Sequence, residues 1–403
     1  MFKYIDISSV DKGLIHWGQV NRYRFTEAPS RARRIIREGD VLLCTVRPGL
    51  QAHTRISRGE EIPFVASTGF AVLRPNTNED SSFIFHQIFS NDVVAQLRAK
   101  EVGSNYPAVN EADVKRLSIF MPEPSQRQAV GKVLDTIDEA ITATEVVIAK
   151  LKQARAGMLH DLLSYGLDEN GQIRDPIAHP EQFKDTPLGC VPKNWDAVRL
   201  VDRADVFGGK RLPGGHTYSD LPTGFRYLRV LDFFEKPISY AELASLEKDT
   251  FAALTRYEIH DGELFISIAG SIGYIGVLRP KKPERIILTE NAARISIRNG
   301  FLPDFLCLFM NGESVQRQIN AEKGIGGGVP KLALHRIERL WIAVPKPEEQ
   351  ERIICKAVQL DQQMKAEQTE LNKLQKIKSG LQDDLLTGRV PVPETIMEGA
   401  TMA

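Results

Sequence analysis

A helical pattern that occurs twice constrains the fold of this chain more than any other feature. Between Ser125 and Ser164, ten positions follow one another in alternating steps of four and three residues, and eight of them are apolar. This spacing is the a/d seam of a coiled coil. Adding 223 to each residue number finds a second seam, which polar residues interrupt at the same two places. The larger apolar seam residues are Val130, Leu134, Ile137, Ile141, Ile148, Leu151, Met158, Leu162, Ile353, Leu360, Met364, Leu371, Leu374, Leu381 and Leu385.

The polar interruptions lie at matched depths in the two seams. Thr144 corresponds to Glu367, and Arg155 corresponds to Lys378. Local hydration, control of the helix register or contact with a partner would each account for them. At about 1.5 Å per residue, roughly 40 helical residues make a rod of about 60 Å, which is longer than an ordinary domain. We therefore expect two long helices that cover each other's seams and carry one globular unit each. Two unrelated surface helices are the alternative.

The repeat also covers the sequence that precedes each helix. With the same shift, Gly39 to Leu42 corresponds to Gly262 to Phe265, and Pro107 corresponds to Pro330. A period this long indicates a duplicated domain and not a solenoid. Alternating and apolar runs predict strands, then a helix and a closing strand, in each unit. The expected strands are 2–7, 41–46, 70–73, 117–121, 227–230, 264–268, 293–297 and 340–344, and the expected helices before the rods are 82–100 and 303–322.

The predicted fold class is α+β, with two repeated mixed α/β domains joined by two long helices that form an antiparallel coiled coil. About 40 residues of the second unit precede Tyr227, but only three residues precede its counterpart Tyr4. The first domain is therefore expected to lack an opening segment. The predicted boundaries are 1–124 for this N-terminally incomplete first domain, 125–165 for the central spacer helix, 166–186 for an acidic, solvated linker, 187–347 for the second domain, 348–388 for the distal spacer helix and 389–403 for a flexible tail.

The formal net charge of zero hides a strong segregation of charge. Nine arginines but only three acidic residues lie between Arg22 and Arg58, whereas residues 122–185 hold seven Lys/Arg and eleven Asp/Glu. One face can therefore be basic although the whole chain is neutral. No apolar run is long enough to span a membrane, and Met1 is not followed by a signal sequence. An intracellular, cytoplasmic protein without membrane contact is expected.

The sequence offers no support for catalysis by this chain. It contains no P-loop, no dinucleotide-binding glycine motif, no paired metal-ligating histidines and no Asn-Pro-Pro-aromatic tetrapeptide of the kind that amino-methyltransferases use. The four cysteines lie far apart, which argues against a zinc knuckle or a disulfide framework. The glycine-rich runs Gly270–Gly276 and Gly324–Gly328 are interpreted as turns. No metal site and no catalytic residue are predicted.

Over essentially its whole length, the chain resembles the specificity subunit of type I restriction-modification systems. The resemblance is carried by the order of several motifs that recur at a fixed interval, each of them weak by itself. These motifs are Pro122-Glu-Pro-Ser-Gln126 and Pro345 to Gln350 before the helices, Asp161-Leu-Leu163 and Asp384 to Gly388 at their ends, the strands that begin at Gly39 and Gly262, and Leu188 to Trp195 at the start of the second unit.

This resemblance implies two target recognition domains separated by helices that act as a ruler. It also implies that two modification subunits dock on the chain, bring S-adenosylmethionine and methylate adenine, and that restriction subunits join for ATP-driven translocation and cleavage, with Mg expected on the partner subunits. The chain itself would bind no cofactor. It would be the non-catalytic part that reads an asymmetric, bipartite double-stranded DNA target. A coiled-coil scaffold that binds proteins and never touches nucleic acid is the alternative.

The residues expected to contact DNA lie in loops, where arginines can bind phosphates and where polar side chains can reach base edges. The first domain contributes Arg22, Arg24, Arg31, Arg33, Arg34, Arg47, Arg55, Asn105 and Tyr106, and the second contributes Lys210, Arg211, His216, Tyr218, Arg226, Ser271, Tyr274, Asn291 and Lys331.

Overall fold

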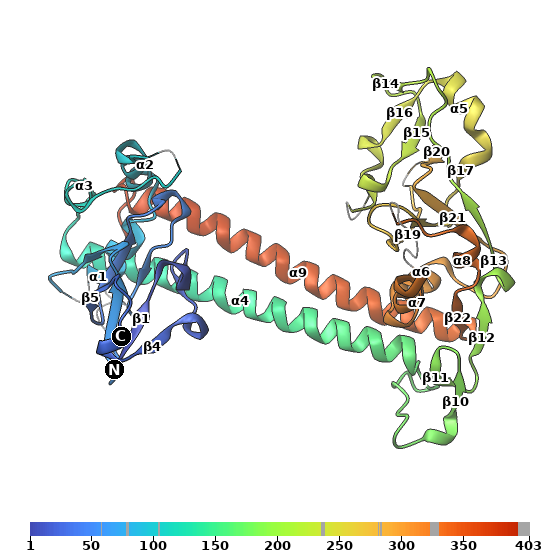
Figure 1. The fold of residues 1–403 in the computed structure, drawn as a ribbon, viewed down its shortest axis with the longest axis horizontal. Coiled ribbons are helices and arrows are strands. Elements are labelled where there is room, and N and C mark those ends of the chain that lie inside the picture. Colours follow the sequence, from blue (N-terminus) through green and yellow to red (C-terminus); the bar gives the residue numbers. More distant parts are fainter. Residues whose placement is uncertain are drawn as a thin grey trace. The chain divides into compact units, whose positions relative to one another are not determined.

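The structure is a computed structural model that describes residues 1–57, 59–77, 80–103, 105–234, 238–280, 282, 284–322 and 330–393. The chain divides into two compact units, of which the first comprises residues 1–148 and 366–403 and the second residues 149–365. The helices α4 (Pro124–Ser164) and α9 (Pro347–Leu385) run through both units (Figure 1). The predicted fold class, two mixed domains and a pair of long helices, is confirmed.

The first unit is built from two small sheets and three short helices. One sheet has the strand order β4-β1-β8-β5, the other has the order β7-β6-β9, and β2 and β3 form a separate pair. The strands are β1 (Phe2–Ile5), β2 (Val10–Asp11), β3 (Leu14–Ile15), β4 (Asn21–Tyr23), β5 (Ala32–Ile36), β6 (Val41–Cys44), β7 (Thr54–Arg55), β8 (Phe64–Ser67) and β9 (Phe70–Leu73). The helices are α1 (Asp80–Gln87), α2 (Asn91–Lys100) and α3 (Glu111–Lys115).

The second unit repeats this scheme and adds strands at its start. Its larger sheets have the orders β14-β16-β15-β20-β17 and β13-β21-β18-β19. The strands are β10 (Phe183–Thr186), β11 (Gly189–Pro192), β12 (Asp196–Arg199), β13 (Ala204–Gly208), β14 (Tyr218–Ser219), β15 (Phe225–Leu228), β16 (Ala244–Leu246), β17 (Glu258–Ile259), β18 (Leu264–Ser267), β19 (Ile275–Val277), β20 (Arg285–Leu288), β21 (Ala292–Ile297) and β22 (Trp341–Val344). The helices are α5 (Lys248–Leu254), α6 (Pro303–Asn311), α7 (Glu313–Glu322) and α8 (Leu334–Glu338).

The duplication extends to the register of hydrogen-bonded strands. In the first unit, β1 pairs antiparallel with β4, which places Lys3 opposite Arg22, and pairs parallel with β8. In the second unit, β15 pairs antiparallel with β16, which places Arg226 opposite Ser245, and pairs parallel with β20. Both members of the second pair lie 223 positions after those of the first. The repeat that the sequence predicts is therefore present in the backbone pairing.

Each unit buries part of the two helical seams. In the first unit, Val130 and Leu134 near the start of α4 share an apolar cluster with Leu385 near the end of α9. In the second unit, Leu162 near the end of α4 and Ile353 near the start of α9 belong to one large core. The helices thus run antiparallel within each unit, as predicted.

The predicted seam residues are covered to different degrees. Seven are buried, namely Val130, Leu134, Ile148, Leu162, Ile353, Leu371 and Leu385. Seven are partly buried, namely Ile137, Ile141, Leu151, Leu360, Met364, Leu374 and Leu381. Met158 is 36% exposed. Five of the seven buried residues, all except Ile148 and Leu371, lie near a helix end, where a globular core adds further apolar contacts.

The closing strand predicted at 117–121 is wrong, since this segment belongs to no strand of the described residues. Its counterpart β22 is a strand because it pairs with β12, which precedes β15 in the chain. A strand needs a neighbour for its backbone groups, and none of the described strands pairs with residues 117–121. The Gln96 side chain instead makes two hydrogen bonds with the backbone of Ser118, of 2.7 and 2.8 Å. Gln318 makes the same pair of bonds with Trp341.

The predicted helices 82–100 and 303–322 are each interrupted. Ser90 caps α2 by accepting a hydrogen bond from the Val93 backbone, which separates α2 from α1. Gly312 lies between α6 and α7. Capping residues and glycine end helices locally even where the apolar pattern continues.

The expected solvated linker is more ordered than the charge pattern suggested. Leu167 is fully buried, and residues 183–186 form β10, which pairs with β11. The Glu349 carboxylate, itself 4% exposed, accepts hydrogen bonds from the Leu167 backbone, from the Trp195 indole at 3.1 Å and from Arg174 at 2.6 and 3.2 Å. Gly166 has a φ of 64°, and a Cβ there would lie 2.3 Å from this carboxylate, so only glycine fits.

The predicted flexible tail begins with a docked segment. Val392 is buried, and its backbone exchanges two hydrogen bonds, of 3.1 and 3.3 Å, with the Gln126 side chain at the start of α4. Gln126 corresponds to Glu349 in the repeat. The start of each long helix therefore binds the segment that follows the other one. Residues 394–403 lie outside the described part of the chain.

Candidate nucleic-acid interface

Two loops of the first unit bring three of the predicted DNA-binding residues together. The loop after β6 contains Arg47, and the loop before α3 contains Asn105 and Tyr106. An isolated bridge between Val46 and Ala108 joins them. The Arg47 guanidinium donates a hydrogen bond to the Asn105 carbonyl at 3.0 Å and lies 4.2 Å from the Tyr106 ring centroid.

These side chains are presented to solvent. Tyr106 is 70% exposed, and Arg47 and Asn105 are also exposed. Arg47 adopts a left-handed backbone with a φ of 48°. Such a conformation costs energy in a residue with a side chain and is concentrated at functional loops. An arginine stacked on an exposed tyrosine can contact both a phosphate and a base.

The second unit repeats this pair of loops with different residues. Ala269, after β18, is bridged to Lys331, before α8, and both positions lie 223 residues after Val46 and Ala108. Ser271 and Lys331 are exposed. The glycine-rich run Gly324–Gly328, interpreted above as a turn, lies outside the described residues. The structure thus places Ser271 and Lys331 at the position that Arg47 and its neighbours occupy in the first unit.

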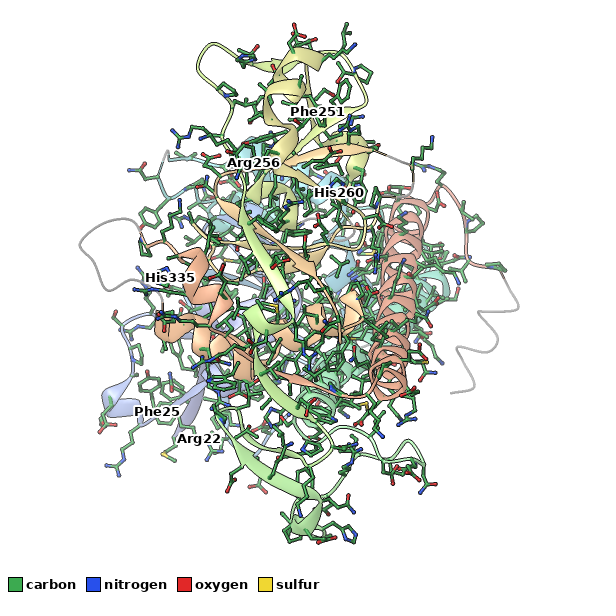
Figure 2. All side chains as sticks on the ribbon, turned by 90° about the vertical axis from the view of Figure 1, so that its right-hand side faces the viewer. Arg22, Phe25, Phe251, Arg256, His260 and His335 are labelled. Atoms are coloured by element: carbon green, nitrogen blue, oxygen red, sulfur yellow. The ribbon has the colours of Figure 1, made fainter. Side chains whose placement is uncertain are left out.

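The dense arginine group of the first unit is divided between the two edges of one sheet. Arg22 lies on β4 and Arg33 and Arg34 lie on β5, which are the outer strands of the order β4-β1-β8-β5. Arg24 and Arg31, in the adjoining loops, are exposed, as are Arg22 and Arg33. Figure 2 shows Arg22 and the 67% exposed Phe25 at the periphery of the ribbon. Arg34 pairs with Glu111 at 3.3 Å on the surface. These arginines therefore do not form one compact cluster.

Arg55 is engaged inside the first unit. Its guanidinium lies 3.0 Å from Asp135 on α4, and the same carboxylate lies 2.8 Å from Nε2 of the buried His86 on α1. Burial by itself raises the pKa of Asp135, but the hydrogen bond from His86 and the charge of Arg55 outweigh it and lower the pKa. The ionised carboxylate thus ties β7 and α1 to the long helix.

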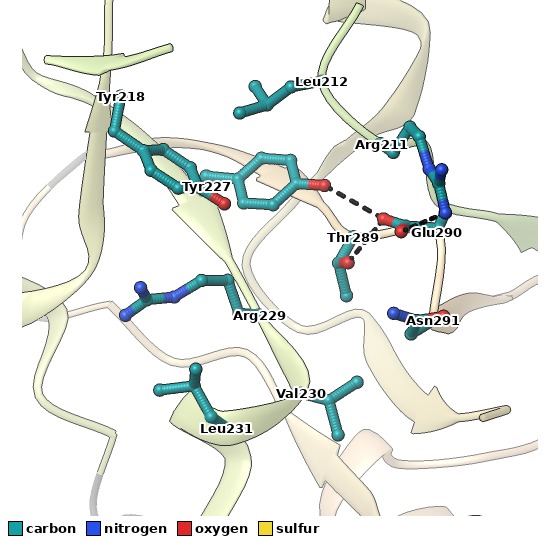
Figure 3. A pocket seen from close by; sticks show the side chains of 10 residues that line it. All are labelled: Arg211, Leu212, Tyr218, Tyr227, Arg229, Val230, Leu231, Thr289, Glu290 and Asn291. Atoms are coloured by element: carbon teal, nitrogen blue, oxygen red, sulfur yellow. Dashed lines mark hydrogen bonds and ion pairs between the residues drawn. The ribbon is translucent and has the colours of Figure 1, made fainter. Parts of the chain in front are cut away.

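A shallow pocket of about 460 Å³ lies on the second unit (Figure 3). It is formed by the segment after β13, by β14 and β15, by the turn after β15 and by the loop after β20. Three of the predicted DNA-binding residues line it, namely Arg211, Tyr218 and Asn291. The other lining residues are Leu212, Tyr227, Arg229, Val230, Leu231, Thr289 and Glu290.

An ion pair is the most prominent polar group of this pocket. Arg211 Nη2 lies 3.3 Å from Glu290 Oε1. The other carboxylate oxygen accepts a hydrogen bond from Thr289 Oγ1 at 2.9 Å, and the Tyr227 hydroxyl oxygen lies 3.4 Å from it. Burial raises the pKa of Glu290, but a hydrogen bond from its own backbone, the hydrogen bond from Thr289 and the charge of Arg211 together lower it. Glu290 is therefore ionised at neutral pH.

Tyrosines form the apolar wall of the pocket. The rings of Tyr218 and Tyr227 lie 5.8 Å apart, and Tyr218 is 43% exposed. Burial raises the pKa of Tyr227 to about 12, so its hydroxyl keeps its proton and donates to the Lys210 carbonyl at 2.8 Å. Arg229 lies below the Tyr218 ring, at 6.0 Å from its centroid, and pairs with Asp232 at 2.8 Å.

Three predicted contact residues make internal contacts. Arg226 donates to the Leu243 carbonyl and to Ser245 Oγ, at 3.2 and 2.8 Å. His216 lies 2.7 Å from Thr250 Oγ1. The Tyr274 ring stacks on Phe233. The structure does not bring these three residues to the pocket.

The pocket also contains polar residues that the sequence analysis missed. Tyr227 and Thr289 lie in or beside buried strands, where an apolar pattern predicts core residues only. Glu290 was missed because an acidic residue is not expected at a DNA surface. No local signal indicates that Glu290 faces Arg211, 79 positions earlier in the chain.

The described residues contain no group of three or more His, Cys, Asp or Glu side chains that could hold a metal ion. Within the same part of the chain, no helix has the length and apolar content that crossing a bilayer requires.

The family model of the type I restriction modification DNA specificity domain matches residues 33–153 and 192–376, in both units. The chain belongs to the DNA specificity family of type I restriction-modification systems. As a DNA specificity subunit, it presents the two bridged loop pairs and the pocket as its candidate surfaces for reading DNA. The two matched segments follow the duplication seen in the strand register.

Two known specificity subunits are similar to the chain over more than two thirds of their length. The type I restriction enzyme MjaVIII specificity subunit of Methanocaldococcus jannaschii is 22% identical over 334 residues, covering 81% of this chain and 74% of the relative. The putative MjaX specificity subunit of the same organism is 21% identical over 332 residues, covering 80% and 71%. A solved chain from a study of complex assembly and conformational transition of the type I R-M system has the same fold, with a TM-score of 0.61, 23% identity and coverage of 96% and 92%.

Proposed function

We propose that this specificity subunit reads an asymmetric, bipartite double-stranded DNA target, one half with each unit. The observation that carries the proposal is that the same strand register is built twice with different side chains at corresponding loop positions. Arg47 corresponds to Gly270, and Ala108 corresponds to Lys331. Two similar but non-identical readers suit two different half-sites, because sequence is read by the side chains that reach base edges.

The long helices would hold the two readers at a set spacing. Ion pairs and apolar contacts join α4 and α9 within each unit, which supports a helix pair as the connecting element. The spacing between the half-sites would then be a property of the helix pair.

Catalysis would belong to other polypeptides. Two modification subunits would supply S-adenosylmethionine and methylate adenine, and restriction subunits with ATP and Mg would translocate and cleave the DNA. Membership of the specificity family supports this division of work, as does the lack of an adenine-methylase tetrapeptide in the sequence.

Methylome sequencing of the host with and without this gene tests the proposal. We expect adenine methylation at one bipartite motif that disappears on deletion and returns when the intact gene is supplied. A methylome that is identical in both strains would overturn the proposal and favour the alternative of a protein scaffold without nucleic-acid binding.

A further inference from the structure

We propose that Arg211 reads a guanine in the half-site of the second unit and that Glu290 is its positioning residue. This inference rests on the proposed function and assigns a base-reading role to the pocket in Figure 3. In that view, the Arg211 guanidinium and the Glu290 carboxylate face each other beside the two tyrosines.

The Arg211 side chain is accessible to DNA, and one edge of its guanidinium is held by Glu290. Its side chain is 76% exposed, whereas that of Glu290 is 27% exposed. The 3.3 Å contact engages Nη2 with Glu290 and limits the rotation of the guanidinium about the last bonds of the side chain. Ordering of this kind lowers the entropy that is lost when the arginine binds a base.

Glu290 is fixed by the core of the second unit. Its carboxylate accepts a hydrogen bond from Thr289, which is 5% exposed, and lies 3.4 Å from the hydroxyl oxygen of Tyr227, which is 3% exposed. A carboxylate held by a buried donor can orient a mobile arginine, in the way that supporting residues orient the residues that contact a ligand.

The backbone beside Arg211 is also fixed. Gly209 donates to the Ala292 carbonyl and Lys210 to the Leu288 carbonyl, both at 2.9 Å. A Cβ on Gly209 would lie 2.0 Å from the Thr289 carbonyl oxygen, so the close approach requires glycine. The segment with Arg211 and the loop with Glu290 and Asn291 therefore form one rigid rim of the pocket.

The pairing favours a base edge over a phosphate. Glu290 offsets part of the Arg211 charge at close range, and an ionised carboxylate repels a nearby phosphate. The hydrogen-bonding geometry of the guanidinium remains. Guanine presents two acceptors, N7 and O6, in the major groove, and arginine is the side chain whose paired donors match them.

The surface around the pair continues towards the loop after β18. The Asn291 carbonyl accepts from the Ile268 and Ala269 backbone at 2.8 and 3.3 Å, and Ala269 is bridged to Lys331. Lys331 is exposed and can bind the DNA backbone. In such an arrangement the phosphate contact positions the protein along the DNA, and the neighbouring side chain reads the base.

The test uses the complete complex with its modification subunits and a duplex that carries the methylated motif found by methylome sequencing. Each guanine of the motif is replaced in turn by 7-deazaguanine, which lacks the N7 acceptor, and the dissociation constants are measured for the intact complex and for Arg211→Ala and Arg211→Lys. We expect one guanine at which the analogue weakens binding of the intact complex by about 5- to 150-fold. At that position the analogue should cause no further loss in Arg211→Ala, which has no donor, and a smaller loss in Arg211→Lys, whose ammonium lacks the paired donors of the guanidinium.

Two more variants separate positioning from folding. Glu290→Gln should reduce the discrimination at the same guanine while the unfolding temperature and the sensitivity at the other half-site stay unchanged. Arg256→Ala serves as the control, because this exposed arginine lies in the turn (Thr255–Tyr257) before β17, at the sheet edge opposite β14. It should leave all guanine sensitivities unchanged.

Two results would overturn the inference while the proposed function stands. One is a bipartite motif in which the effect of 7-deazaguanine is independent of Arg211 at every guanine. The other is that Glu290→Gln weakens discrimination at a cytosine, whereas Arg211→Ala binds all duplexes as the intact complex does. Absence of any bipartite motif in the intact strain would instead overturn the proposed function itself.

Discussion

Lys378 on α9 contacts Asp138 on α4, with Nζ 2.5 Å from Oδ1. The repeat counterparts of these residues are Arg155 and Asp361, which form an ion pair in the second unit, with Nη2 of the arginine 3.1 Å from Oδ2. Each basic residue that interrupts one seam is therefore matched by a carboxylate of the other helix. This pairing supports register control as the reason for these interruptions, because a shift of either helix would separate both pairs.

A double-mutant cycle on Asp138→Asn and Lys378→Met measures the Lys378 pair. Both side chains are about 30% exposed, so we expect a coupling energy of about 0.5–1 kcal/mol in the free energy of unfolding by urea. The more exposed pair Glu370 and Lys373, within α9, provides the control and should couple by about 0.2–0.5 kcal/mol. Equal coupling in the two cycles would contradict a role in joining the helices.

Replacement of Glu349 by Ala should destabilise the second unit. The change leaves Arg174, whose side chain is 10% exposed, and the Trp195 indole without their acceptor. Removing one partner of a buried ion pair costs about 3–5 kcal/mol. Denaturant unfolding of the variant measures the loss. Glu348→Ala, at an exposed neighbouring position, is the matched control and should change the free energy of unfolding by less than about 0.5 kcal/mol.

Acid should destabilise the first unit through His53. This histidine is fully buried, its Nδ1 accepts from the Cys44 backbone at 2.9 Å, and burial lowers its pKa to about 4. An unfolded histidine titrates near about 6.5, so between these values the unfolded state binds a proton that the folded state does not. The free energy of unfolding should therefore fall by about 1–3 kcal/mol as the pH decreases from about 6.5 to about 4.

Unfolding curves over this pH range check the prediction with two variants. His53→Asn should flatten the dependence, whereas His260→Asn, at an exposed position, should preserve it. The same slope in His53→Asn as in the unchanged protein would show that another group is responsible.

Joint replacement of Arg33 and Arg34 by Ala should weaken DNA binding and reduce its salt dependence. Each phosphate contact that is lost lowers the slope of log K against log salt by about 0.9. A titration of the complex at several salt concentrations measures it. Arg98→Ala, an exposed arginine on α2, serves for comparison. An unchanged slope in the double variant would exclude β5 from the DNA-binding surface.

The sequence indicated several residues of the candidate site, but it did not indicate which contacts these residues make. Arg47, Asn105 and Tyr106 were predicted from their loops, and the structure joins them through a stacked ring. Arg55 was predicted to contact DNA by the same reasoning, and its guanidinium forms an ion pair with Asp135. Charge density along the chain cannot separate these two arginines, because the partner of each lies far away in sequence.

The sequence by itself determined the duplication, the long antiparallel helices and the order of elements in each unit. These follow from apolar periods and from a constant shift, which are local properties of the chain. Only the tertiary structure decided that 117–121 pairs with no strand of the described residues, that Glu349 anchors the supposed linker and that Glu290 faces Arg211. Those outcomes depend on which distant segments share a sheet edge or a core, and packing in three dimensions selects them.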